Sequence, residues 1–100
     1  MVNIYKDYYL DADAFQYILG KAATRKRGGA EVLEITRPTY HGTIAQALAA
    51  ILESETRQLI AAREVNSMDE LLTAYRATAA EITAPFVEAR QSLGKVVLEV

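Results

Sequence analysis

The sequence predicts an α+β fold, and three observations lead to that class. Along the first 40 residues apolar side chains alternate with polar ones, as they do in half-buried strands. From residue 43 onward the apolar positions recur every three or four residues, as they do on one face of a helix. No internal repeat or low-complexity linker separates the two halves. We therefore expect residues 1–100 to form a single domain.

Three strands are expected in residues 1–40, joined as an antiparallel meander. The first covers Ile4–Leu10 and the second begins at Phe15. Gly28-Gly29 supply the positive φ angles that a tight hairpin turn requires before the third strand, residues 30–37. Pro38 lacks an N–H for the ladder and is expected to end that strand. Alternation then assigns one face of the sheet to the core: Ile4, Tyr8, Leu10, Phe15, Tyr17, Leu19, Leu33 and Ile35.

Two helices are expected to follow and to pack on that face of the sheet, over residues 43–64 and 67–93. Each begins with a capping box, in which a hydroxyl accepts from a backbone N–H three residues on: Thr43 with Gln46, and Ser67 with Glu70. Pro85 removes one helical hydrogen bond, so the second helix should kink near residues 83–84. The β-prone residues 95–100 favour a short C-terminal strand, with a frayed tail as the alternative.

The second helix carries a heptad-like seam, and the spacing allows two interpretations. Packing within the chain, on the first helix and the sheet, is the simpler one. Dimerisation through the helix is the competitor. The seam runs through Met68, Leu72, Tyr75, Ala79, Ile82, Phe86, Ala89 and Leu93.

Composition excludes several kinds of chemistry. The chain has no cysteine, so disulfides, thiolate catalysis and zinc–thiolate sites are ruled out, and the single histidine, His41, cannot build a multi-histidine metal site. Asp11 and Asp13 suit a turn better than a cation site. There is no glycine-rich phosphate loop. We expect no enzyme activity, no cofactor and no metal, and the absence of a signal-peptide pattern or a long apolar run predicts a cytoplasmic protein without a membrane partner.

A basic hairpin tip is the strongest local charge feature in a chain of net charge −2. Its cations could contact phosphates, because a two-stranded ribbon fits the major groove of DNA. The alternative is a solvated bend, in which lysine and arginine discourage edge pairing. The cations are Lys21, Arg25, Lys26 and Arg27.

The sheet face opposite the predicted core is apolar and aromatic for a surface in water. Stacking of bases on it is disfavoured by Asp7 and Glu34, which would repel a phosphate backbone. Burial against a protein partner or a second copy of the chain fits the mixture better. The predicted interface consists of Tyr5, Tyr9, Ile18 and Val32.

Several residues, together with the order of the expected elements, carry a resemblance to a known group of proteins: Tyr8-Tyr9, Tyr17-Ile18-Leu19, Tyr40, Thr43, Ala47-Leu48 and Leu71-Leu72. In these features the chain resembles small uncharacterised proteins encoded by phages and prophages of Gram-positive bacteria. The resemblance implies a setting among genes for recombination, replication or counter-defence, and it transfers no activity and no site residue.

The predicted function is therefore a non-enzymatic accessory protein that binds another protein and forms a homo-oligomer. An accessory nucleic-acid binder in phage recombination or replication, using the basic tip, is the alternative. A third class is an anti-defence protein that binds a host factor or a small signalling molecule, which would require an enclosed pocket.

Overall fold

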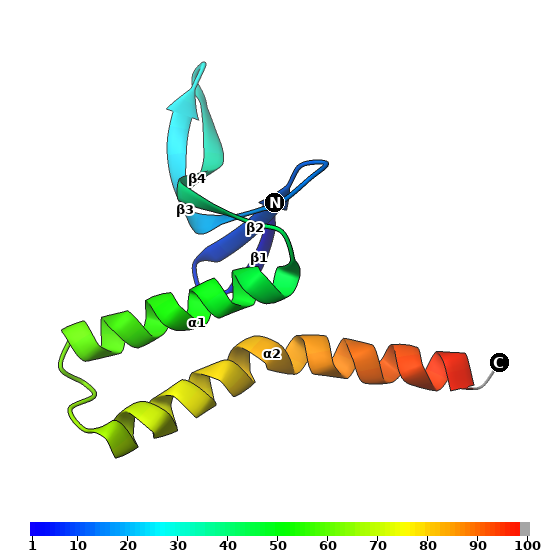
Figure 1. The fold of residues 1–100 in the computed structure, drawn as a ribbon. Helices are drawn as coiled ribbons and strands as arrows, with labels where there is room; N and C mark the ends of the chain where they lie inside the picture. Colours follow the sequence, from blue (N-terminus) through cyan, green and yellow to red (C-terminus); the bar gives the residue numbers. More distant parts are fainter. Residues whose placement is uncertain (99–100) are drawn as a thin grey trace. The chain divides into compact units, whose positions relative to one another are not determined.

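The computed structural model describes the backbone of residues 1–98 and the side chains of residues 1–88. It confirms the α+β class, with a single sheet of four antiparallel strands in the order β1-β2-β3-β4 rather than three (Figure 1). Two compact units, Met1–Ile51 and Leu52–Val100, divide the chain inside its first helix. The predictions of a single domain and of two helices on one sheet face stay predictions. The elements are β1 (Val2–Tyr5), β2 (Tyr8–Ala12), β3 (Tyr17–Arg27), β4 (Ala30–His41), α1 (Ile44–Ala61) and α2 (Met68–Leu98).

The additional strand arises because the predicted first strand folds back on itself. Lys6 has a positive φ of 48°, and the chain reverses at Lys6-Asp7 between β1 and β2. The Asn3 side chain closes this turn, since its Nδ2 donates to the Lys6 carbonyl at 2.7 Å and to the Tyr8 carbonyl at 3.1 Å. Without glycine, proline or asparagine at the bend itself, alternation alone made Ile4–Leu10 resemble one strand.

The last strand continues past Pro38, contrary to the prediction. Between the pairs Leu19↔Thr39 and Lys21↔Thr36, β4 has one residue more than β3, so Gly20 lies opposite a bulge. Arg37, with a φ of 48°, makes this bulge together with Pro38. A bulge leaves one residue outside the ladder, and β4 is an edge strand, so the missing proline N–H is tolerated.

The buried hydrophobic residues of the first unit come from β2, β3 and the first turns of α1. Tyr8 and Leu10 alternate onto one face of β2, and Leu19 lies directly opposite Leu10 on β3. Ala47 and Ile51 of α1 are fully buried as well. The burial of Tyr8, Leu10 and Leu19 confirms the predicted core face for these residues. The prediction is wrong for Phe15 and Leu33, which are both exposed.

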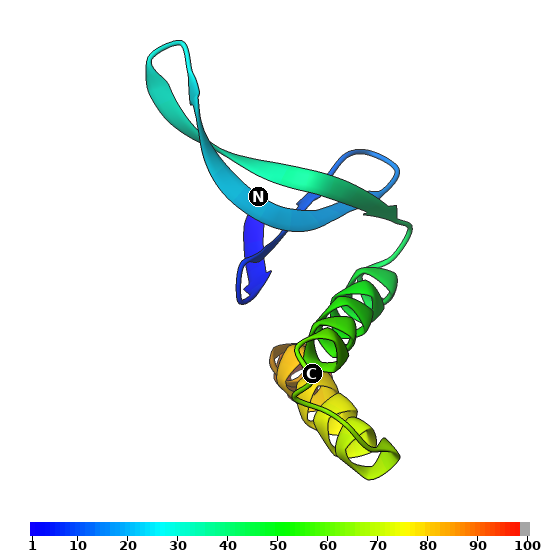
Figure 2. The same cartoon turned by 90° about the vertical axis from the view of Figure 1, so that its left-hand side faces the viewer.

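Beyond this core the sheet narrows to two strands. β2 pairs only with Tyr17–Lys21 of β3. From Ala22 outward β3 pairs with β4 alone, through the Gly28-Gly29 turn, whose φ angles are 58° and 85°. We call this projecting ribbon, residues 22–35, the hairpin arm; Figures 1 and 2 show its length and twist. A two-stranded ribbon is marginal on its own, so the arm depends on its side-chain contacts.

Helix α1 begins at the predicted cap and ends earlier than predicted. Gln46 N donates to Thr43 Oγ1 at 3.1 Å, and Gln46 Oε1 accepts from Gly42 N at 2.9 Å. At the other end Arg63 takes a φ of 59°, and Glu64 N bonds back to the Leu59 carbonyl at 3.0 Å. This left-handed cap terminates the helix at Ala61, with arginine in the position where glycine is commonest.

Helix α2 starts at the predicted cap, where Glu70 N donates to Ser67 Oγ at 3.2 Å. It continues to Leu98, so the strand predicted for residues 95–100 is wrong over 95–98, while residues 99–100 lie outside the described part. The helix contains Pro85, and Figure 1 shows its axis changing direction where the colour passes from yellow to orange. Thr83 Oγ1 donates to the Ala79 carbonyl at 2.8 Å, a back-bond that also bends helices.

Candidate functional site

The antiparallel register places a small apolar group on the sheet face opposite the core. Tyr9 pairs with Gly20, and Ile18 pairs with both Asp11 and Tyr40, so Tyr9, Ile18 and Tyr40 share that face. We call these three residues the open face. Tyr9 and Ile18 are half-buried, whereas Tyr40 is 56% exposed. The group lies on strands held by the central ladder of the sheet, so its geometry is fixed by backbone hydrogen bonds.

The four residues of the predicted interface do not all lie together. Tyr9 and Ile18 belong to the open face, but Tyr5 pairs with Tyr8 and so registers with the opposite face. Val32 pairs with Arg25 in the hairpin arm, where it is exposed. The Lys6-Asp7 turn and the bulge at Arg37-Pro38 each shift the alternation of side chains between the two sheet faces. Residues that strict alternation would place on one face therefore lie on different faces.

Phe15 is exposed on a turn that the sequence predicted at Asp13, although Phe15 itself was expected in the core. Its side chain is 91% exposed. Asp13 Oδ1 accepts from Phe15 N at 2.8 Å and from Gln16 N at 3.0 Å, and Asp13 N donates to the Gln16 carbonyl at 3.1 Å. The hydrogen bond from the Phe15 backbone N–H holds the pKa of the Asp13 carboxyl below its ordinary value. The predicted turn aspartate thus leaves Phe15 outside the strand and in solvent.

The basic tip is neutralised more than its local sequence indicates. Arg27 Nε donates to Glu34 Oε1 at 2.9 Å and its Nη2 to Oε2 at 3.3 Å, a two-point contact across the arm. Arg25 Nε lies 3.6 Å from Glu34 Oε2. The hydrogen bond from Arg27 lowers the pKa of Glu34, and the same contact raises the pKa of Arg27. One carboxylate therefore holds two of the four predicted phosphate contacts.

The other two cations differ from each other. Lys21 Nζ lies 3.7 Å from Asp7 Oδ2 and 5.3 Å from the centre of the Tyr8 ring, at the root of the arm. Lys26 is exposed near the tip, and the register places it directly opposite Glu31. An acidic residue therefore lies beside or directly opposite each of the four cations of the predicted basic tip.

The described seam residues of α2 are mostly exposed, which the simpler interpretation of their spacing did not predict. Met68 is 68% and Leu72 43% exposed, and Tyr75 is exposed too. Ile82 is the buried member. The less exposed residues of this helix lie on a neighbouring stripe that includes Leu71, Ala74, Thr78 and Ile82. Packing within the chain therefore accounts for that stripe and leaves the N-terminal part of the seam open.

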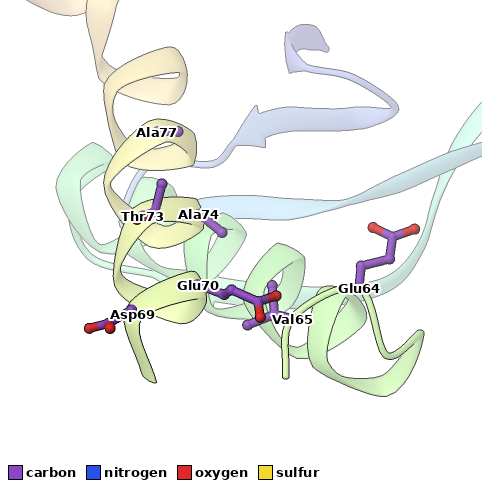
Figure 3. A pocket seen from close by; sticks show the side chains of 7 residues that line it. All are labelled: Glu64, Val65, Asp69, Glu70, Thr73, Ala74 and Ala77. Atoms are coloured by element: carbon purple, nitrogen blue, oxygen red, sulfur yellow. The ribbon is translucent and has the colours of Figure 1, made fainter. Parts of the chain in front are cut away.

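An open pocket of about 420 Å³ lies beside the start of α2 (Figure 3). Its lining combines small residues with the acids Glu64, Asp69 and Glu70, and Figure 3 shows the carboxylates of Glu64 and Asp69 directed away from each other. Glu70 is also engaged by Ser67 of the helix cap. Within the described residues no group of three or more His, Cys, Asp or Glu side chains could hold a metal ion. The pocket supplies no convergent set of reactive groups.

His41, the single histidine, has a structural contact. Its Nε2 lies 2.9 Å from Thr39 Oγ1, two residues back along β4. The Thr39 hydroxyl is also 3.4 Å from the Leu19 carbonyl, which it can donate to. The imidazole is therefore tied to the strand end next to the start of α1.

No helix in the described part of the chain has the length and apolar character needed to cross a membrane. No family model, no curated protein and no solved structure matches the chain. The resemblance to phage and prophage proteins stays a prediction, and the function has to be argued from the surfaces themselves.

Proposed function

We propose that this chain is a non-enzymatic accessory protein that works by binding another protein through the open face. Its cytoplasmic setting in a bacterial host, and its place among phage or prophage genes, are part of the same proposal. The observation that carries the proposal is the display of Tyr40, a large aromatic side chain of the open face that is 56% exposed on a hydrogen-bonded strand. Phe15, on the turn that joins β2 and β3, is a second exposed aromatic side chain. Aromatic residues of this kind supply much of the binding energy at protein interfaces.

The geometry supports a preorganised contact. Tyr40 is held in β4 by its pairing with Ile18, and Phe15 by the backbone bonds that Asp13 accepts. A side chain whose backbone is already held in place requires less ordering on binding than one on a mobile loop. Asp11, on the same face as Ile18, adds a negative charge to the rim. A protein surface with an apolar centre and basic edges would complement this arrangement.

Capture from a bacterial host lysate, with quantification by mass spectrometry, tests the proposal. The bait is the full chain, compared with Tyr40→Ser and Tyr9→Ser. Partners enriched on the wild type should be lost from both variants, while circular dichroism shows an unchanged fold. Phe86→Ser is the matched control, because it removes an exposed aromatic from α2 and not from the sheet. If both sheet variants fold and retain every partner, the open face is not the contact surface.

The alternative, nucleic-acid binding by Lys21, Arg25, Lys26 and Arg27, has one supporting feature. The hairpin arm is a two-stranded ribbon, a form that fits the major groove. Glu34 weighs against it, because its carboxylate would have to release Arg25 and Arg27 before either could bind a phosphate. We therefore rank it second.

A further inference from the structure

The N-terminal part of the α2 seam is an apolar stripe that packing within the chain leaves in water. Met68, Leu72 and Tyr75 are exposed, and Ala79 completes the stripe as a half-buried residue. These four positions follow steps of four, three and four, the spacing that matches a second helix in a coiled coil. A helix face of this kind calls for another helix with the same period.

Two charged residues beside the stripe indicate which helix would pair with it. Asp69 and Arg76 are seven residues apart, so they lie on the same side of α2, each one position after a seam residue. Among the described side chains neither takes part in an ion pair. One acid and one base, two helical turns apart, are complementary to the same pair running in the opposite direction.

We infer that this segment pairs with the same segment of a second copy of the chain, in antiparallel orientation about a two-fold axis near residues 73–74. In this register Leu72 lies opposite Tyr75 of the second copy at the centre of the contact. Met68 lies opposite Ala79 of the second copy at each end, so a large side chain faces a small one there. Asp69 then lies beside Arg76 of the second copy. Two-fold symmetry repeats every contact, which gives two such ion pairs.

The antiparallel register is preferred to a parallel one for electrostatic reasons. In a parallel pair each seam residue faces its own copy, but the two copies of Asp69 lie on opposite sides of the seam, and so do Asp69 and Arg76 of different copies, so this acid and this base cannot pair. The antiparallel register brings Asp69 of one copy and Arg76 of the other to the same side of the seam, where they attract each other. The segment also lies N-terminal to Pro85, so the bend in α2 does not interrupt the contact.

Charge reversal on the full chain, read by sedimentation equilibrium, tests this dimer. The wild type should associate at concentrations below about 1 mM. Asp69→Arg and Arg76→Asp each convert both attractive pairs to repulsive ones and should weaken the dimer by about tenfold or more. The double variant D69R/R76D restores both pairs and should dimerise like the wild type. An equimolar mixture of the two single variants should form a heterodimer.

Orientation is tested by cysteines placed in this cysteine-free chain. Met68→Cys alone should not cross-link, because the two copies of position 68 are about 16 Å apart along antiparallel helices. Met68→Cys combined with Ala79→Cys should give an oxidised dimer. A Met68→Cys dimer would instead indicate parallel helices and overturn the inference.

Three further results would also overturn it: a monomeric wild type throughout the concentration range, single reversals that associate like the wild type, or a double variant that stays dissociated. Circular dichroism distinguishes each of these results from unfolding of a variant. Unfolding is not expected, because the substituted positions are exposed or half-exposed on the helix: Met68, Asp69, Arg76 and Ala79. The seam and the open face belong to different units of the chain, so failure of this dimer leaves the proposed partner contact untouched.

Discussion

The hairpin arm and the α2 seam reverse the expectations that their sequences create. The arm has a run of cations, yet Glu34 binds two of them from the neighbouring strand. The seam has the spacing of a packed helix, yet Met68 and Leu72 are exposed. The difference shows that the net charge of a strand surface depends on the side chains of the neighbouring strand, here Glu34. The spacing of apolar residues along a helix, by contrast, predicts an apolar stripe but does not predict which element covers it.

The sharpest contrast between a packed residue and a seam residue is expected for Ile51 and Leu72. Ile51 is 0% exposed, so Ile51→Ala should lower the free energy of unfolding by about 2–5 kcal/mol through lost burial and a cavity. Leu72→Ala should cost less than about 1 kcal/mol in a dilute sample, because its side chain is already partly in water. Denaturant unfolding at low protein concentration measures both. Equal losses would mean that Leu72 belongs to the core and not to an open seam.

The next effect concerns the root of the hairpin arm. A Cβ at Gly20 would lie 2.5 Å from Ile35 Cγ2 and 2.8 Å from the Thr36 carbonyl oxygen. Gly20→Ala should therefore destabilise the protein by about 1–3 kcal/mol, since the backbone opposite has to move. Gly42→Ala is the control, because a Cβ there would meet only Gln46 Oε1 at 3.5 Å. A neutral Gly20→Ala, measured by denaturant unfolding, would mean that the bulge opposite it adapts freely.

Much of the fold follows from local rules that operate within a few residues. Both helices start at the predicted caps, because a Ser or Thr hydroxyl reaches the backbone N–H three residues on. The returning bond of the first box differs from the prediction, since Gln46 Oε1 accepts from Gly42 N, one residue before the cap. The Gly28-Gly29 turn formed for the same kind of reason, since only its φ angles are needed to specify it. The core residues Tyr8, Leu10 and Leu19 follow from alternation near the centre of the sheet.

The errors occur where a local rule was offset by a more distant partner. The left-handed turn at Lys6 is closed by Asn3, whose Nδ2 donates to the carbonyls of Lys6 and Tyr8, and nothing at Lys6 itself indicates a bend. Pro38 is accommodated by a bulge whose other half is Gly20, 18 residues earlier in the sequence. The helix persists to Leu98 although Gly94 and the β-branched run after it favour an ending.

The candidate site was only half predictable for the same reason. Tyr9 and Ile18 were assigned correctly to one face, because both lie within the regular β2–β3 ladder. Tyr5 lies beyond the Lys6-Asp7 turn and Val32 lies beyond the Arg37-Pro38 bulge, so neither continues the alternation of faces that Tyr9 and Ile18 follow. Phe15 could have been found from the Asp13 turn, because an aspartate that binds the N–H groups of the next residues removes them from the strand.

A smaller effect tests whether Glu34 is what keeps the arm from binding phosphates. Glu34→Gln removes the charge that holds Arg25 and Arg27, so binding to a short mixed-sequence DNA duplex should tighten at low salt. Each additional phosphate contact should steepen the log–log salt dependence by about 0.9. Glu31→Gln is the matched control, because it removes one charge from the same arm and leaves the two arginine contacts in place. Fluorescence anisotropy measures both; if Glu34→Gln equals Glu31→Gln, the arginines are not phosphate contacts and the nucleic-acid alternative fails.

The smallest expected effect is a pH dependence confined to the arm. Because Arg27 lowers the pKa of Glu34, the stabilisation from their contact is fully present above the ordinary glutamate pKa of 4.5 and is lost as the pH falls through the lowered value in the folded protein. Carbon-detected NMR titration of the side-chain carboxyls should therefore show Glu34 titrating below 4.5. Arg27→Gln should move the Glu34 pKa back towards its ordinary value and leave Asp13 unchanged, since the Asp13 pKa is lowered mainly by the Phe15 backbone N–H. If Arg27→Gln shifts neither carboxyl, the two-point contact does not persist in solution, and the arm's cations are as available as the sequence first indicated.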